Sequence, residues 1–165
     1  MVDQPSRGYL PLVSAVAVLI AVAAAVLAAL TAGQMSDAEK QSSVRDGALA
    51  AGRQIAVDFA AYDYRHIAAD FKRVADESTG KFHSDYLTQT TGLHDLIVKA
   101  KAVSTAEVAS AGVVGATADR ATVVVALNRT IRNSSSENPT ADSFGVQILL
   151  VHQDGRWLAS ELTPV

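Results

Sequence analysis

The strongest constraint on the fold of this chain is a long run without any charged side chain. Residues 10–30 read LPLVSAVAVLIAVAAAVLAAL. As a helix this run would span about 31 Å, at about 1.5 Å per residue, which matches the hydrocarbon core of a bilayer. We therefore expect a transmembrane anchor over 10–32. A cleaved signal peptide is the alternative, because small residues follow the run, but its apolar region normally covers only about 7–15 residues.

The charges around this run predict an orientation. The tail 1–9 carries Arg7 and the free amine against Asp3, and the next charged residues after the run are Asp37, Glu39 and Lys40. The positive-inside bias places such a tail in the cytoplasm. The chain is thus expected to be single-pass in the cell membrane, with an extracytoplasmic domain over 33–165. Which envelope membrane holds it is open.

Composition excludes several classes of function. The chain has 14 basic and 17 acidic residues and a net charge of −3, whereas nucleic-acid binding needs a clustered basic surface. It has no cysteine, so disulfides, thiolate nucleophiles and cysteine zinc sites are excluded. Its four histidines form no HxH or HExxH motif, and no P-loop, GxSxG or GxGxxG motif is present. We therefore expect no metal, no cofactor and no enzymatic activity.

The first part of the domain has a helical period. Val44, Ala48, Ile55 and Phe59 recur at spacings typical of one helix face, and Ser36 is a plausible N-cap. The pattern predicts helices over 37–60, 63–76 and 81–101. The first helix is either separate from the apolar run or a continuous extension of it.

The period changes to two after residue 103. Segments 103–114, 120–131, 143–152 and 156–163 are rich in β-branched and apolar residues and are separated by turn residues. Asp154-Gly155 is a strong hairpin signal, because glycine accepts the positive φ that such turns require. The sequence predicts an α+β domain in which three helices cover one face of a curved, four-stranded antiparallel meander.

This order of elements resembles the cone of nuclear transport factor 2 and the SnoaL-type proteins. Local sequence narrows the likeness through the motifs AVDF (56–59), YDY (62–64), STGKF (78–82) and DGRWL (154–158). Together they resemble the Mce-associated membrane proteins of mycobacteria and related actinobacteria. The resemblance implies a non-enzymatic, envelope-bound accessory protein that stabilises or scaffolds an Mce-type lipid import complex. It implies Mce-type transporter subunits or related membrane proteins as partners, and no catalytic residue.

An NTF2-like cone often encloses a pocket, which gives a second hypothesis of a lipid- or hydrophobe-binding module. Aromatic side chains on the helix and sheet faces would line such a pocket. The candidates are Phe59, Tyr62, Phe82, Tyr86, Phe144 and Trp157. The alternative is that these residues simply fill the core, because the chain has few aromatic residues to spare.

An envelope enzyme is the third hypothesis. Asp63, His66 and Asp70 have the i, i+3, i+7 spacing of one helix face. A histidine between two carboxylates can act as a base or as part of a metal site. The same spacing is typical of a solvated face with ion pairs. The apolar residues of this helix lie on the opposite face, so we expect the triplet to face water.

Overall fold

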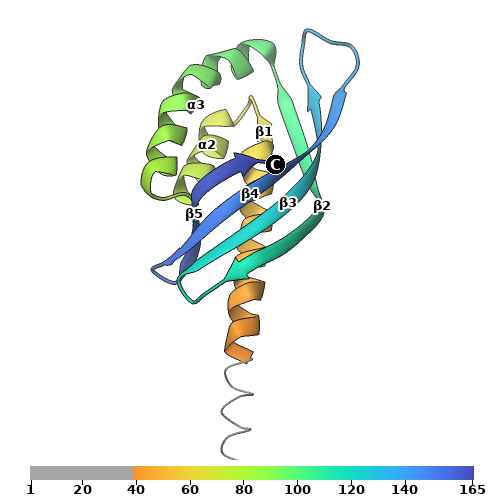
Figure 1. Cartoon of the computed structure of the whole chain (residues 1–165). Helices are drawn as coiled ribbons and strands as arrows, with labels where there is room; N and C mark the ends of the chain where they lie inside the picture. The colour runs from red at the N-terminus through yellow and green to blue at the C-terminus, as the bar shows by residue number, and fades with distance from the viewer. Residues whose placement is uncertain (1–38) are drawn as a thin grey trace, which may run out of the picture. The chain divides into compact units, whose positions relative to one another are not determined.

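The computed structural model describes residues 39–165 (Figure 1). The predicted tail 1–9 and anchor 10–32 lie outside the described residues. Within 39–165, every helix falls short of the length or apolarity needed to cross a bilayer. Residues Gln41–Val165 form one compact unit, and the fold below is that of this unit.

The described chain forms three helices and a single antiparallel sheet. All strands except the short β1 follow the helices, as the change of period predicts. The first described helix covers 39–60. The remaining elements are β1 (Tyr62–Asp63), α2 (Ile67–Asp76), α3 (Gly80–Ala100), β2 (Val103–Ala116), β3 (Arg120–Arg132), β4 (Thr140–Gln153) and β5 (Arg156–Pro164). The strands lie in the order β1-β2-β3-β4-β5, and each neighbouring pair is antiparallel. The α+β class is therefore confirmed.

The predicted count of four strands is wrong by one, and the second helix begins later than residue 63. Tyr62 pairs with Ser104, and the Tyr64 N–H donates to the Ala102 carbonyl at 3.1 Å. These bonds hold 62–64 against the start of β2, so Tyr62 and Asp63 are extended and a turn follows them before α2 begins. Two residues are too few to show a period of two, which explains why the strand was not predicted.

The core lies between the 39–60 helix and one face of β3, β4 and β5. Figure 1 shows this helix crossing behind the strands. Its small residues allow a close approach: a Cβ added at Gly52 would lie 2.8 Å from Cγ1 of Val123. The largest fully buried side chains are Ile55, Val74, Val123, Val125, Leu127, Val146, Ile148 and Leu150. Strict alternation along β3 and β4 puts the strand residues of this set on one face, and Ile55 and Val74 come from the first helix and α2.

The two ends of the meander are finished differently. The β4–β5 hairpin turns at Asp154 and Gly155, whose φ values are +50° and +77°, as the two-residue turn predicts. At the β2 side, β1 pairs with only two residues. Farther along β2, Gln41 Nε2 donates to the Ala116 carbonyl at 3.0 Å and Arg45 donates to the Val113 carbonyl at 3.4 Å. Side chains of the first helix thus donate hydrogen bonds to backbone carbonyl groups on this edge.

Candidate functional site

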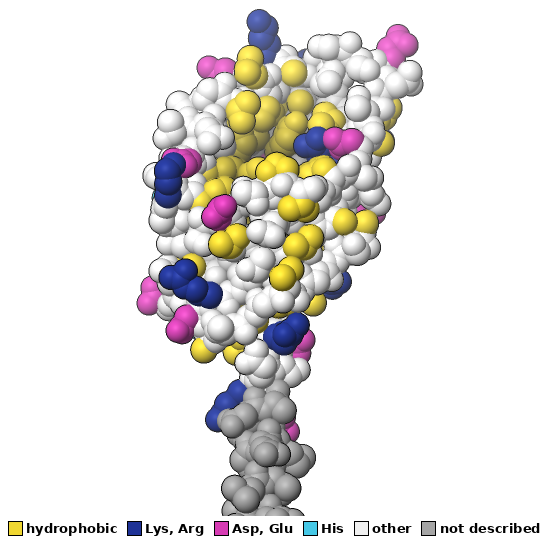
Figure 2. All heavy atoms as spheres, in the orientation of Figure 1, with side chains coloured by type: hydrophobic (Ala, Val, Ile, Leu, Met, Phe, Trp, Pro, Cys, Tyr) yellow, Lys and Arg dark blue, Asp and Glu magenta, His cyan; other side chains and the backbone are white. Residues whose placement is uncertain are grey.

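An apolar hollow opens between α3 and the strands. Figure 2 shows hydrophobic side chains gathered in it, with polar side chains around its margin. A pocket of about 390 Å³ lies between α3 and β5, and its volume is within the range typical of small-molecule sites. The pocket is lined by Phe59, Lys81, Phe82, Asp85, Tyr86, Gln89, Ser160, Glu161 and Leu162. Three of the six aromatic residues named from the sequence therefore line one pocket.

Tyr86 is the centre of the aromatic cluster beside this pocket. Its ring centroid lies 6.3 Å from that of Phe59, 6.1 Å from that of Phe82 and 6.2 Å from that of Phe71, which it meets edge to face. Phe82 and Tyr86 are four residues apart on α3 and so share a face. Burial raises the pKa of the Tyr86 hydroxyl to about 12, with the negative charge of Asp70 adding to the effect. The hydroxyl is therefore neutral and able to donate a hydrogen bond at physiological pH.

The remaining predicted aromatic residues lie elsewhere. Phe144 lies under the guanidinium of Arg129, whose Cζ is 4.8 Å from the ring centroid, and Arg129 also pairs with Asp142. Tyr62 is close enough to Arg129 to be among the groups that raise the pKa of that guanidinium, after Asp142. Trp157 does not line the pocket; its ring centroid is 4.8 Å from that of His152. A Cβ added at Gly47 would lie 3.4 Å from the Trp157 indole nitrogen, so Trp157 packs against the first helix.

The exposed face of α3 is a feature that the sequence analysis missed. Thr90 is its only buried residue, although α3 is 21 residues long. Four large apolar side chains of α3 are exposed: Leu87 at 46%, Leu93 at 46%, Leu96 at 62% and Val98 at 40%. Helical spacing puts Leu93 and Leu96 on the same side of α3 as Tyr86, whereas Leu87 and Val98 lie on the opposite side. Neighbouring exposed apolar side chains such as Leu93 and Leu96 mark an interaction site more often than scattered single residues do. The sequence predicts a helix over 81–101, but it does not show which apolar side chains of that helix lack a covering partner.

The polar candidates assemble into an ion-pair network rather than a solvated face. Asp70 is only 8% exposed and Asp58 only 7%. Arg73 bridges them, with Nη1 3.0 Å from Oδ1 of Asp58 and Nη2 2.8 Å from Oδ1 of Asp70. The Gln54 side-chain amide donates a further bond of 2.6 Å to Asp58. The expectation that Asp70 faces water is therefore wrong, because Arg73 compensates its burial.

Asp63 and His66 belong to the start of the same region. Asp63 pairs with Arg65, and its backbone N–H donates to Oδ2 of Asp70 at 2.9 Å. His66 is the residue preceding α2, and its Nε2 lies 3.9 Å from Oδ2 of Asp63. Both carboxylates are thus engaged by arginines and backbone. Among the described residues, no group of three or more acidic and histidine side chains has a metal-binding arrangement.

Glu77 borders this network and has an unusual protonation state. Burial raises the pKa of its carboxyl to about 7, and the negative charge of Asp58 and a hydrogen bond with it add to the shift. Its Oε2 is buried without a hydrogen-bond partner. The folded state therefore favours the protonated acid, so the contribution of Glu77 to stability is greatest below pH 4.5 and is lost as the pH rises through 7.

Replacing Glu77 with glutamine is expected to raise stability at alkaline pH. The neutral amide keeps the shape of the protonated acid, so Glu77→Gln should be more stable than the unmodified chain by about 2 kcal/mol at pH 8.5, allowing for solvent screening of the half-buried group. At pH 5 the two should be nearly equal. Thermal unfolding at both pH values checks this, with Glu107→Gln as an exposed control. Equal gains at pH 5 and pH 8.5 would contradict the assigned ionisation.

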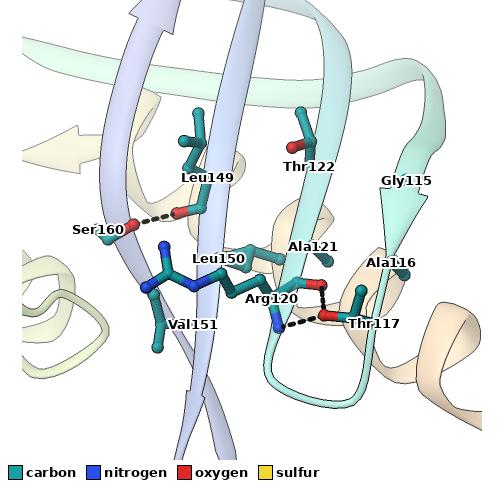
Figure 3. A pocket seen from close by; sticks show the side chains of 10 residues that line it. All are labelled: Gly115, Ala116, Thr117, Arg120, Ala121, Thr122, Leu149, Leu150, Val151 and Ser160. Carbon is teal, nitrogen blue, oxygen red and sulfur yellow. Dashed lines mark hydrogen bonds between the residues drawn. The ribbon is translucent and has the colours of Figure 1, made fainter.

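A second pocket lies on the outer face of β3 and β4, near the β2–β3 turn (Figure 3). It measures about 280 Å³ and contains none of the residues named from the sequence. The Thr117 hydroxyl donates to the Arg120 carbonyl at 3.2 Å and accepts the Arg120 N–H at the same distance. The pocket is therefore bordered by the hydrogen-bonded β2–β3 turn on one side and by residues of β4 and β5 on the other.

Comparison with known proteins places the chain in a family. The family model described as "Uncharacterized protein Rv1363c/MT1408-like" matches residues 10–164. The chain belongs to the Rv1363c/MT1408-like family. It is also 33% identical over 147 residues to a protein named outer membrane protein Rv1973 from Mycobacterium tuberculosis, covering 83% of this chain and 89% of that one. This family assignment does not extend to the association with Mce complexes that the sequence resemblance suggests.

The Rv1363c/MT1408-like domain shares its fold with several solved bacterial structures, which include a type IV secretion system protein and a periplasmic fragment. The matches include an IcmL-like type IV secretion system protein from Legionella pneumophila (TM-score 0.58, 11% identity, 71% of this chain and 90% of that one). A periplasmic fragment of TraM (0.58, 14%, 72% and 95%) and Agrobacterium tumefaciens VirB8 (0.57, 11%, 70% and 88%) are similar. These structures support a helix-covered, curled antiparallel sheet; the narrower NTF2-like assignment remains a prediction.

Proposed function

We propose that this chain is a non-enzymatic, membrane-anchored accessory protein of the cell envelope that stabilises or scaffolds an Mce-type lipid import complex. The observation that carries the proposal is the uncovered apolar face of α3 beside the hollow. Leu93 and Leu96 expose 46% and 62% of their surface there, which is unfavourable in water unless a partner covers it. The name of the mycobacterial relative and the periplasmic origin of the similar folds support an envelope location.

The polar network supports a structural rather than catalytic reading of Asp63, His66 and Asp70. Two of these three groups are held by arginine ion pairs within the fold. A general base must instead reach the proton that it removes from a substrate. The anchor would then serve to concentrate the domain beside membrane partners, which raises the effective concentration for weak contacts.

The test is a crosslinking pull-down of the full-length protein from membranes, followed by mass spectrometry. Mce or permease subunits should be recovered, and their steady-state level should fall when the gene is deleted. The double substitution Leu93→Gln, Leu96→Gln should lower recovery at least about fivefold, because it removes apolar contact area from the interface. Val114→Gln is the matched control, since Val114 is 69% exposed on β2. Unchanged partner levels in the deletion strain would contradict the proposal.

The pocket favours a second candidate function, the binding of a lipid or another hydrophobe. Its volume of about 390 Å³ and its floor of Phe59, Phe82 and Tyr86 suit an apolar group. Organic extraction of the purified ectodomain (33–165), followed by mass spectrometry, should then return a stoichiometric ligand. Leu162→Trp would fill the pocket and should abolish this recovery. An empty ectodomain purified without detergent argues against this candidate.

A further inference from the structure

The free edge of β5 lies beside the apolar hollow, and we propose that it pairs with an extended segment of a partner protein. This inference rests on the proposed function, because it specifies how the scaffold holds its partner. Three features of the molecule carry it: the backbone groups at the edge, the hollow next to them and the charge on the rim.

Residues 77–79 of the same chain already form backbone hydrogen bonds with the first part of this edge. The Thr79 N–H donates to the Ala159 carbonyl at 2.8 Å, and the Ala159 N–H donates to the Glu77 carbonyl at 2.8 Å. Ser78 thereby forms a parallel bridge with Ala159. The chain then turns into α3 at Gly80, whose φ is +60°. The pairing that starts at Ala159 is therefore not continued along the rest of β5 by 77–79.

The register shows which backbone groups remain on the edge. Leu162 pairs with Ile148, and the Val165 N–H donates to the Gly145 carbonyl at 3.0 Å. Backbone groups of successive strand residues point to opposite sides, so the N–H and C=O of Leu162 face away from β4. Pro164 lies two residues on, where its missing N–H costs no ladder bond, as expected of proline in an edge strand. The edge thus offers the Leu162 N–H and the carbonyls of Leu162 and Pro164.

The hollow borders this same stretch of β5. Ser160, Glu161 and Leu162 line the pocket together with Phe59 and residues of α3. Recognition by strand addition needs both elements: main-chain bonds supply affinity, and pockets for alternate side chains supply specificity. A segment paired with Leu162 can therefore place an apolar side chain against Phe82 and Tyr86.

The charge on the rim defines the partner further. Lys81 and Asp85 form an ion pair with each other, whereas Glu161 is exposed and has no ion pair within residues 39–165. A lysine or arginine next to the apolar residue of the partner segment would pair with Glu161. A second copy of this chain, paired edge to edge, would instead bring its own Glu161 close to this one, and like charges disfavour that arrangement. The occupant is thus a basic, alternating segment of a different protein.

The experiment uses the full-length chain in lipid nanodiscs and a fluorescein-labelled peptide, Lys-Val-Lys-Leu-Lys-Val. Fluorescence anisotropy should show saturable binding, and hydrogen exchange should show new protection of the Leu162 amide. Methylating the central amides of the peptide should weaken binding about threefold to tenfold, because each loses a main-chain hydrogen bond. Leu162→Pro removes the outward N–H and also replaces a side chain that lines the pocket and packs against the core, so it should weaken binding at least as much. Glu161→Lys should weaken binding about fivefold, and Glu137→Lys in the β3–β4 loop should not.

Several results would overturn the inference. Equal binding of the methylated and unmethylated peptides would show that no strand is added. Protection of the hollow by palmitate without any peptide binding would identify a lipid occupant, and edge protection that depends on protein concentration would identify a second copy. If Mce subunits co-purify equally with Leu162→Pro and the unmodified chain, the docking mode fails while the proposed function stands. If they fail to co-purify with the unmodified chain, the proposed function fails whatever the peptide does.

Discussion

Replacing Arg73 with methionine is expected to lower the free energy of unfolding by about 3 kcal/mol. Arg73 compensates two carboxylates, Asp58 and Asp70, that are 7% and 8% exposed. Removing one partner from a buried ion pair typically costs about 3–5 kcal/mol, because a charge is left without compensation. The expected loss lies at the low end because 46% of the Arg73 side chain is accessible, so water can reach the vacated space.

Denaturant unfolding at neutral pH measures this loss, with Arg53→Met as the control. Arg53 is exposed on the first helix, so its replacement changes the net charge equally without uncovering a buried carboxylate. Adding Asp58→Asn and Asp70→Asn to Arg73→Met should recover most of the stability, because the uncompensated charges disappear. A loss below about 0.5 kcal/mol for Arg73→Met alone, the usual size of a surface effect, would mean that the carboxylates are solvated.

Replacing Gly52 with leucine should also cost about 3 kcal/mol, through overpacking. A Cβ at this position would lie 2.8 Å from Cγ1 and 2.9 Å from Cβ of Val123, and Val123 is fully buried. The added side chain can be accommodated only if the helix moves away from the sheet. Part of the core contact between Ile55 and the strands would then be lost.

Gly92→Leu provides the matched control for this substitution. Gly92 also lies inside a helix, but nothing approaches within 4 Å of its added Cβ. There the change should raise stability by up to about 1 kcal/mol, because leucine favours a helix more than glycine does. Calorimetric unfolding of both variants therefore tests the sign as well as the size. Val123→Ala should partly rescue a Gly52→Ala variant, and strict additivity of the two would contradict the close approach.

Periodicity was sufficient to predict the architecture where elements were long. The spacing of Ala48, Ile55 and Phe59 predicted the first helix, and alternation along 120–131 predicted β3. β1 was not predicted, because two residues are too few to show a period. Its position depends on backbone bonds to Ala102 and Ser104, which are far away in the sequence. Elements held by distant partners are poorly visible in a local pattern.

The candidate site was predicted only in part for the same reason. Phe82 and Tyr86 share a helix face by spacing alone, and both line the pocket. Asp70 is buried beside Arg73, which is close in sequence. Arg73 also bonds to Asp58, which lies on the first helix and so outside the pattern of α2. Trp157 packs against Gly47, more than one hundred residues away, so its absence from the pocket could not be read from the strand that contains it.

The contacts of Gln41 and Arg45 with the edge of β2 also bear on how this protein avoids aggregation. The strand is long and made largely of alanine, glycine and valine beyond its short pairing with β1, a composition that readily templates intermolecular β-pairing. Two register shifts, at Val108/Ser110 and Val113/Gly115, interrupt its regularity. The first helix therefore protects the sheet edge as well as filling the core, and Gln41→Ala, Arg45→Ala should form thioflavin-positive aggregates at temperatures below the midpoint of unfolding.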